Sequence, residues 1–244
     1  MQSGILLAQS GDIDIMIHGL FSYELFGQTF WITTSHVCIL IVMLTLIVFA
    51  FIANRKLKAA TEVPDGFQNV LELAVEALDG MVQSSMKSHW RPFANYIETI
   101  GLFILFSNIS GLLGLRPPTA DYGTTFALAV ITFFLIHINK IRHNSPKAIW
   151  TDMCSPLPPW LPIWLPINII SELAVPVSLS LRLFANILSG TVIMALIYGL
   201  LGKIAIIWPS VLHIYFDLFS GAIQTYVFCM LTMTYITQAI GDDD

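Results

Sequence analysis

Apolar residues gather in five long segments of this 244-residue chain, with short polar stretches between them. A helix that crosses a bilayer needs about 20 mostly apolar residues. The pattern predicts spans over residues 34–53, 93–115 and 124–139, and two longer units over residues 167–201 and 204–240. Each of the last two exceeds the length that an upright helix requires, so strong tilt or a re-entrant hairpin is predicted for both. The predicted fold is an all-α membrane protein with about five transmembrane units.

The polar stretches between the spans carry weaker signals. Residues 61–90 repeat with the period of a helix, whose two sides collect different residues. One side holds Val70, Leu73, Ala74, Ala77, Leu78 and Met81, and the other holds Glu72, Glu76, Asp79 and Gln83. This distribution predicts an amphipathic helix on the membrane surface. Residues 140–166 carry five prolines between positions 156 and 166, which predicts a loop and not a regular helix. Residues 1–33 are predicted as the N-terminal tail of a single membrane domain.

Composition supports the membrane assignment and excludes several other classes. Hydrophobic residues make up 56% of the chain and charged residues 11%, whereas soluble domains carry about 25% charged residues. The net charge of -5 gives no basis for nucleic-acid binding. Cys38, Cys154 and Cys229 are isolated from one another and lack the spacing of a metal site or disulfide framework, so no metal and no cofactor is expected.

Basic residues predict the orientation. Eight of the eleven Lys and Arg residues follow the first and third predicted spans. They are Arg55, Lys56, Lys58, Lys87 and Arg91 in the first group, and Lys140, Arg142 and Lys147 in the second. Because Lys and Arg concentrate in cytoplasmic loops, the N-terminus is expected outside and the C-terminus in the cytoplasm. The early residues lack the basic region of a signal peptide, so the N-terminus is expected to be retained, and a bacterial inner membrane is favoured.

Arg182 lies inside the first of the two long units and is the most informative residue of the chain. A guanidinium remains charged at physiological pH, and at the centre of a bilayer it costs from about 3 to about 10 kcal/mol or more. At about 100° per residue, one stripe of this unit collects Ser171, Ser178, Arg182, Asn186 and Ser189. Such a charge persists only where it has a function.

The last unit carries a second polar stripe, made of Asp217, Ser220, Gln224, Tyr235 and Gln238. Consecutive helices usually pack together, so the two stripes are expected to lie near each other. Ionisable groups within a membrane commonly form proton relays, which makes Asp217 a candidate. Glu172 and Asp121, near the ends of hydrophobic units, could extend a polar path toward water.

Structural interpretations remain open for the same residues. Serines such as Ser178 often bond backbone carbonyls in membrane helices, and Gln224 could simply join two helices. His137 and His213, near span ends, are expected at the membrane interface. Arg182 could form an internal ion pair with Asp217 or Glu172.

The segment from Pro166 to Gly190, PINIISELAVPVSLSLRLFANILSG, resembles the signature of subunit a of F-type ATP synthases. The resemblance extends to DLFSGAIQ at 217–224, to the turn between Arg116 and Asp121, and to the five-unit layout, so that it covers nearly the whole chain. Two positions depart from some bacterial members of the family. Thr191 stands in place of a glutamate, and Asp217 in place of a histidine.

The resemblance implies a stationary, non-catalytic subunit that carries H+ or Na+ between the membrane's two sides and a rotating c-ring. It implies that Arg182 is the essential arginine, that Asn186 and Gln224 are its polar neighbours, and that Ser178 lies toward the inner half-channel. Ion entry is then expected to depend on Asp217. The implied partners are the c-ring, peripheral-stalk b subunits, other ATP synthase subunits and the lipid bilayer.

A secondary transporter for an anionic substrate is the alternative function. Its arginine would bind the substrate where helices break near the membrane midplane, and Pro176 and the proline-rich loop fit this weakly. The chain shows no internal repeat of spans, which counts against it.

Overall fold

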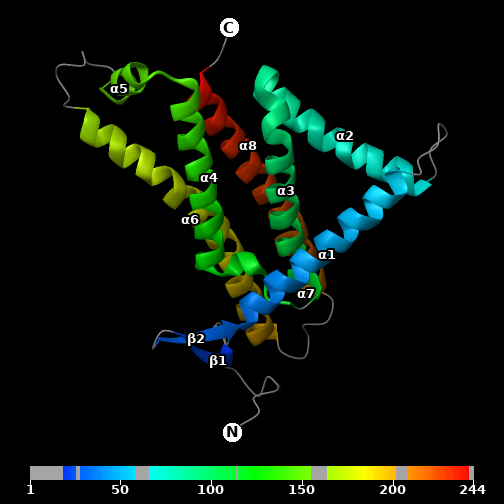
Figure 1. Cartoon of the computed structure of the whole chain (residues 1–244). Helices are drawn as coiled ribbons and strands as arrows, with labels where there is room; N and C mark the ends of the chain where they lie inside the picture. Colours follow the sequence, from blue (N-terminus) through cyan, green and yellow to red (C-terminus); the bar gives the residue numbers. More distant parts are fainter. Residues whose placement is uncertain are drawn as a thin grey trace.

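The computed structural model describes residues 19–25, 28–58, 66–113, 115–154, 164–201 and 208–241. Its first elements are two antiparallel strands, β1 (Gly19–Leu25) and β2 (Gln28–Thr33), with Leu25 opposite Gln28. This hairpin lies within the predicted N-terminal tail, and the hydropathy pattern did not predict it. It ends where the first span begins, at one end of the helical bundle (Figure 1).

Helices form the rest of the described structure. They include α1 (Thr34–Leu57), α2 (Gly66–Met86), α3 (Trp90–Ile109), α4 (Tyr122–His143), α5 (Pro146–Cys154), α6 (Leu165–Leu201), α7 (Trp208–His213) and α8 (Gly221–Ile240). Within the described residues, five helical segments are long and apolar enough to cross a membrane. The prediction of an all-α membrane protein with about five transmembrane units is confirmed.

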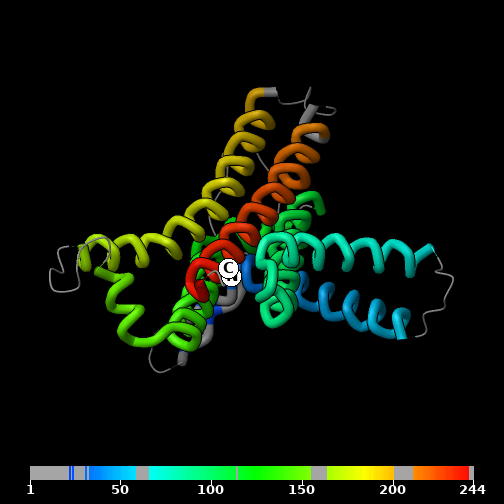
Figure 2. Tube along the Cα trace, turned by 90° about the horizontal axis from the view of Figure 1, so that it is seen from above, coloured from blue at the N-terminus to red at the C-terminus, as the bar shows by residue number. Residues whose placement is uncertain are grey.

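The two long C-terminal units are inclined relative to α3 and α4 (Figure 1). Helix α6 has 37 residues, which at 1.5 Å per residue corresponds to about 55 Å, far more than the hydrocarbon thickness of about 30 Å. Pro176 lies inside α6 and lacks the N–H that would complete the ladder of hydrogen bonds. Seen from above, α6 changes direction along its length, and its second half runs beside the α7–α8 segment (Figure 2).

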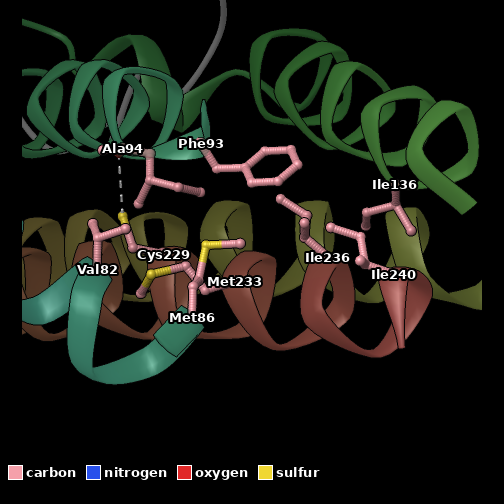
Figure 3. Close-up of a cluster of buried hydrophobic side chains, with 10 residues drawn as sticks. Val82, Met86, Phe93, Ala94, Ile136, Cys229, Met233, Ile236 and Ile240 are labelled. Atoms are coloured by element: carbon pink, nitrogen blue, oxygen red, sulfur yellow. Dashed lines mark hydrogen bonds between the residues drawn. The ribbon is translucent and has the colours of Figure 1, made fainter. Parts of the chain in front are cut away.

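Buried side chains connect these helices. One cluster joins α2 and α3 to α8 and includes Val82, Met86, Phe93, Cys229 and Met233 (Figure 3). A second cluster, with Leu179, Leu183 and Phe228 among its members, joins α6 to α3, α4 and α8. The face of α6 that carries Leu179 and Leu183 is thereby fixed against the bundle.

The structure describes most of both predicted connecting segments, residues 61–90 and 140–166. In α2, Val70 and Leu73 are exposed, whereas Leu71, Val82 and Met86 are buried. The structure thus has a helix within the predicted range, while its place on the membrane surface stays a prediction.

The predicted loop 140–166 is also partly helical. Helix α4 continues to His143, and α5 follows over Pro146–Cys154. Proline is well tolerated in the first turn of a helix, where its missing N–H would have no partner. Residues 155–163, which hold four of the five prolines used for the prediction, lie outside the described residues.

Candidate functional site

Arg182 lies in the middle of α6, beside the buried residues Leu179 and Leu183 but itself exposed. Its side chain is exposed, as are those of Ser178 and Ser189 on the same helix. Arg182 has no ion pair or hydrogen bond with any described residue, and Asp217 and Glu172 pair with other groups. The interpretation of Arg182 as half of an internal ion pair with Asp217 or Glu172 is therefore wrong. The guanidinium instead faces out of the chain at membrane depth.

Asn186 lies one turn after Arg182 on α6, and Gln224 lies on the neighbouring helix α8. The hydroxyl of Ser220 donates to Oδ1 of Asn186 at 3.1 Å, so the two predicted polar stripes do meet at this point. Gln224 is 8% exposed. The amide nitrogens Nδ2 of Asn186 and Nε2 of Gln224 are both buried without an acceptor among the described residues. Buried amide donors normally have a partner, so these two nitrogens keep a donor capacity that the described residues do not satisfy.

Asp217 sits in a π-helix, η5 (Ile214–Ser220), which lies between α7 and α8. Such wide turns are rare and frequently occur at functional sites. Oδ2 of Asp217 is 2.7 Å from Nδ1 of His213, and Nε2 of His213 is 3.1 Å from the hydroxyl of Tyr198 on α6. His213 is thus part of a polar row with Asp217, which the expectation of a merely interfacial histidine did not include.

The residues at and just after the end of α3 pack against Asp217 and the start of α8. A methyl group added at Gly111 would lie 3.3 Å from Cγ of Asp217, so only a small residue leaves the carboxylate its place. Asn108 is buried, accepts from the hydroxyl of Thr119 at 2.7 Å, and donates to the carbonyl of Gly221 at 3.1 Å. These bonds hold the junction between the π-helix and α8 against α3 and the turn that precedes α4.

A second polar group lies at the other end of α4. Nζ of Lys140 is 2.7 Å from Oε1 of Glu172 and 3.0 Å from Oδ2 of Asp152, and His137 is 3.4 Å from the other oxygen of Glu172. These four residues border a cavity of about 340 Å³, which is also lined by Ser171 and by Tyr235 and Gln238 of α8. Ser171 belongs to the first predicted polar stripe, and Tyr235 and Gln238 belong to the second.

Asp121 and Glu172 lie at opposite ends of α4. Asp121 is the N-cap of that helix and accepts from the backbone N–H of Gly123 at 3.0 Å, whereas Glu172 contacts Lys140 near the helix end. The 22 residues of α4 correspond to about 33 Å, close to the thickness of the hydrocarbon core. Glu172 and Asp121 therefore do not form one shared path, and Glu172 lies on the side of the basic loops.

The sequence missed three polar residues of these groups. Tyr198 and Lys140 reach their partners across different helices, and Asn108 is contacted by residues 11 and 113 positions away. Only the spacing of four residues between His213 and Asp217 was visible in the sequence. Thr191, at the position of the absent glutamate, bonds the carbonyls of its own helix at 3.2 and 2.8 Å.

Comparison with known proteins agrees with this arrangement. The family model described as ATP synthase A chain matches residues 36–237. An ATP synthase subunit a from Pelobacter propionicus is 35% identical over 80% of this chain and 82% of its own length. One from a Sulfurihydrogenibium species is 34% identical over 83% of this chain and 96% of its own length.

A further relative is described as a sodium ion specific ATP synthase subunit a, from Propionigenium modestum. It is 34% identical over 87% of this chain and 76% of its own length. The match to the family model covers both polar groups and Arg182. The chain belongs to the ATP synthase A chain family, and is an integral membrane component of the complex: the stator subunit through which ions cross the membrane.

Proposed function

We propose that this chain forms two half-channels that open on opposite sides of the membrane and end at Arg182, against a ring of c subunits. The observation that carries the proposal is the exposed guanidinium of Arg182, in the middle of a helix long and apolar enough to cross a membrane and without an ion pair among the described residues. A charge in this position is costly without a partner. A carboxylate on each ring subunit would supply that partner as it passes.

The fixed charge of Arg182 then controls loading of the ring. A nearby positive charge favours the ionised form of a carboxylate, so the ring site releases its ion as it reaches Arg182. The same charge repels an ion that would leak directly from one half-channel to the other. The free amide nitrogens of Asn186 and Gln224 would donate to the ionised carboxylate.

The two polar groups supply the half-channels. Asp217 and His213 would line the outer one, and the cavity beside Glu172 and Lys140 the inner one. Ser178 is exposed on α6 between Glu172 and Arg182, which suits a position toward the inner half-channel. Their separation along α4 supports this division, because neither group reaches both membrane surfaces.

The proposal includes the setting of the chain. The basic loops place the inner group in the cytoplasm of a bacterial cell, with the N-terminus outside and the C-terminus inside. Peripheral-stalk b subunits would hold the chain still while the ring turns. The chain itself makes and breaks no covalent bond. Its contribution is the ion path, where each charge moved through 100 mV supplies about 2.3 kcal/mol.

The test is ATP-driven ion pumping by the purified complex in lipid vesicles. Arg182→Ala should abolish pumping while the complex still assembles, because the guanidinium is exposed and has no ion pair or hydrogen bond among the described residues. Arg182→Lys should also fail or be severely impaired, since an ammonium does not reproduce the planar fork. Leu173→Ala, an exposed position on the same helix, is the matched control and should pump within about twofold of wild type. Near-normal pumping by either arginine variant would refute the proposal.

The secondary transporter that the sequence left open is set aside by the family to which the chain belongs. Of its two weak supports, Pro176 lies inside the helix α6, and most of the proline-rich loop lies outside the described residues.

A further inference from the structure

Lys140 lies between two carboxylates that belong to different helices. Its Nζ is 2.7 Å from Oε1 of Glu172 on α6 and 3.0 Å from Oδ2 of Asp152 on α5. The side chain of Lys140 is 17% exposed, that of Glu172 32% and that of Asp152 66%. Helix α5 lies where α4 ends and α6 begins (Figure 1). One sheltered ammonium is therefore shared by a half-buried carboxylate and an exposed one.

The second oxygen of Glu172 faces a different group. Its Oε2 is 3.4 Å from Nε2 of His137, and Nδ1 of the same ring is 3.0 Å from the carbonyl of Phe133. A carbonyl only accepts hydrogen bonds, so Nδ1 carries the proton of a neutral ring and Nε2 has the lone pair. Two acceptors then face each other across the gap between Oε2 and Nε2. A proton added to Oε2 would close this gap with a hydrogen bond, while Lys140 keeps Oε1.

Polar space surrounds this carboxylate. The cavity of about 340 Å³ that Lys140 and Glu172 line is also lined by Asp152. A second cavity, of about 310 Å³, includes Asp152, Glu172, Ser171 and Asn168 in its lining. A water molecule takes about 30 Å³ in the liquid, so each cavity has room for several. Protons therefore have a wet route to Glu172 past Asp152, whose side chain is the most exposed of the group.

Resting on the half-channel function proposed above, we propose that Lys140 is a positioning residue for proton transfer at Glu172. Its ammonium pairs with Glu172 while that carboxylate is ionised, and with Asp152 alone while Glu172 holds a proton. Lys140 also keeps Oε1 occupied, so that the proton binds at Oε2, beside His137. The shared ammonium lets Glu172 change its charge without leaving a sheltered charge uncompensated.

The transfer during ATP-driven pumping balances in protons and charge. At the start Glu172 is ionised, and its Oε1 accepts from Lys140. A proton from water on the side of the basic loops adds to Oε2, and the new O–H donates to Nε2 of His137. The three side chains of Lys140, Asp152 and Glu172 together carry one negative charge before this step and none after it. The O–H bond then breaks as the proton leaves toward the ring, and Glu172 regains the ammonium.

Each partner of Lys140 is needed for a different reason. Without Asp152, the ammonium would lose its only counter-charge whenever Glu172 took up a proton, and a sheltered charge without a partner is costly. Without Lys140, two carboxylate oxygens that both lie within 3.0 Å of Nζ would face each other. Like charges favour the protonated form, so Glu172 would release its proton less readily. The two losses act on Glu172 in opposite directions.

The same contacts make H+ the ion of this step. Oε1 of Glu172 and Oδ2 of Asp152 already bind an ammonium, with which a metal cation would have to compete, whereas a proton needs only the lone pair of Oε2. Among the described residues, no group of three or more His, Cys, Asp or Glu side chains is arranged to hold a metal ion. The family does not decide this point, because a relative of similar identity is described as sodium ion specific.

The experiment measures ATP-driven acidification of vesicles that contain the whole complex, oriented so that the medium bathes the inner half-channel. The initial rate is followed as the pH of the medium is varied. Because pumping requires Glu172 to take up a proton, the rate falls as the pH rises. Asp152→Asn should move the pH of half-maximal pumping about one unit lower, and Lys140→Gln should move it about one unit higher.

Two control variants separate this role from a structural one. Lys140→Arg keeps the charge and should keep the midpoint of wild type. Lys147→Gln, at an exposed basic residue of α5, should give a pH profile that superimposes on that of wild type. If Lys140 and Asp152 only supported the fold, their variants would lower the rate by the same factor at every pH and leave the midpoint in place.

The outcomes distinguish this inference from the function on which it rests. Unmoved midpoints, or shifts of Lys140→Gln and Asp152→Asn in the same direction, would overturn the role of Lys140, and the half-channels would stand if Arg182→Ala still failed to pump. The shift of either variant decides the point if the other does not assemble. Uptake of radioactive Na+ without acidification by wild-type vesicles would also overturn it. Normal pumping by Arg182→Ala would instead overturn the half-channel function itself.

Discussion

Replacing Gly221 with alanine is expected to loosen α8 from α3 and to displace the π-helix that carries Asp217. Gly221 is the first residue of α8 and directly follows that π-helix. A methyl group at this position would lie 2.8 Å from Cβ of Asn108 and 3.4 Å from its Cγ and Nδ2. Carbon atoms in ordinary contact lie about 3.5–4.0 Å apart, so the two helices would have to separate by about 1 Å.

The magnitude follows from the contacts of Asn108, which is 1% exposed. Its bond from Thr119 at 2.7 Å prevents the side chain from moving away, and its bond to the carbonyl of Gly221 at 3.1 Å would be strained or lost. Overpacking costs about 1–3 kcal/mol, and a buried donor left unpaired about 1–3 kcal/mol. Alanine returns about 1 kcal/mol of helix propensity. The net loss of stability is about 3 kcal/mol.

For a chain of this length, such a loss corresponds to a melting temperature about 6–12 °C lower. The assay is to heat the purified complex in detergent and follow the amount of this chain that remains soluble. Gly80→Ala is the control, because a methyl group there meets nothing within 4 Å, and it should leave the midpoint unchanged or slightly higher. Equal midpoints for the two variants would refute the packing argument. Pumping by Gly221→Ala should also decrease, since Asp217 would no longer face the outer path correctly.

Three further outcomes are expected. Asp217→Asn should lower ATP-driven pumping at least tenfold, about 1.4 kcal/mol in barrier height. Thr191→Val should leave the pumping rate nearly unchanged, because the threonine hydroxyl bonds carbonyls of its own helix. Similar rates for both variants would place ion entry elsewhere. A cysteine at position 220 should react with a membrane-impermeant thiol reagent added from the side opposite the basic loops, whereas a cysteine at the fully buried position 228 should not. If neither cysteine reacted, the polar stripe around Ser220 would be closed to water. Glu172→Gln should slow pumping several-fold with little loss of assembly, as partly exposed ion pairs contribute about 0–1 kcal/mol, and an unchanged rate would remove Glu172 from the inner path.

The sequence by itself determined the membrane fold and the long C-terminal units, and it singled out Arg182 as the main candidate for a functional residue. These conclusions depend on transfer free energies that belong to each residue or segment: long apolar runs need a bilayer, and a guanidinium within one needs a function. The motif around Arg182 then predicted the family, which the comparisons confirmed. None of this required knowledge of which helices are neighbours.

The tertiary structure decided which polar residues act together. Glu172 pairs with Lys140 and Asp152, and not with Arg182, and Tyr198 reaches His213 across two helices. The sequence could not predict these pairs, because a polar stripe shows only which side of a helix is polar and not what that side meets. For the same reason the sequence could not show which apolar residues of α2 pack against protein: a membrane helix has apolar surroundings on every side, so hydrophobicity alone does not distinguish a protein neighbour from lipid.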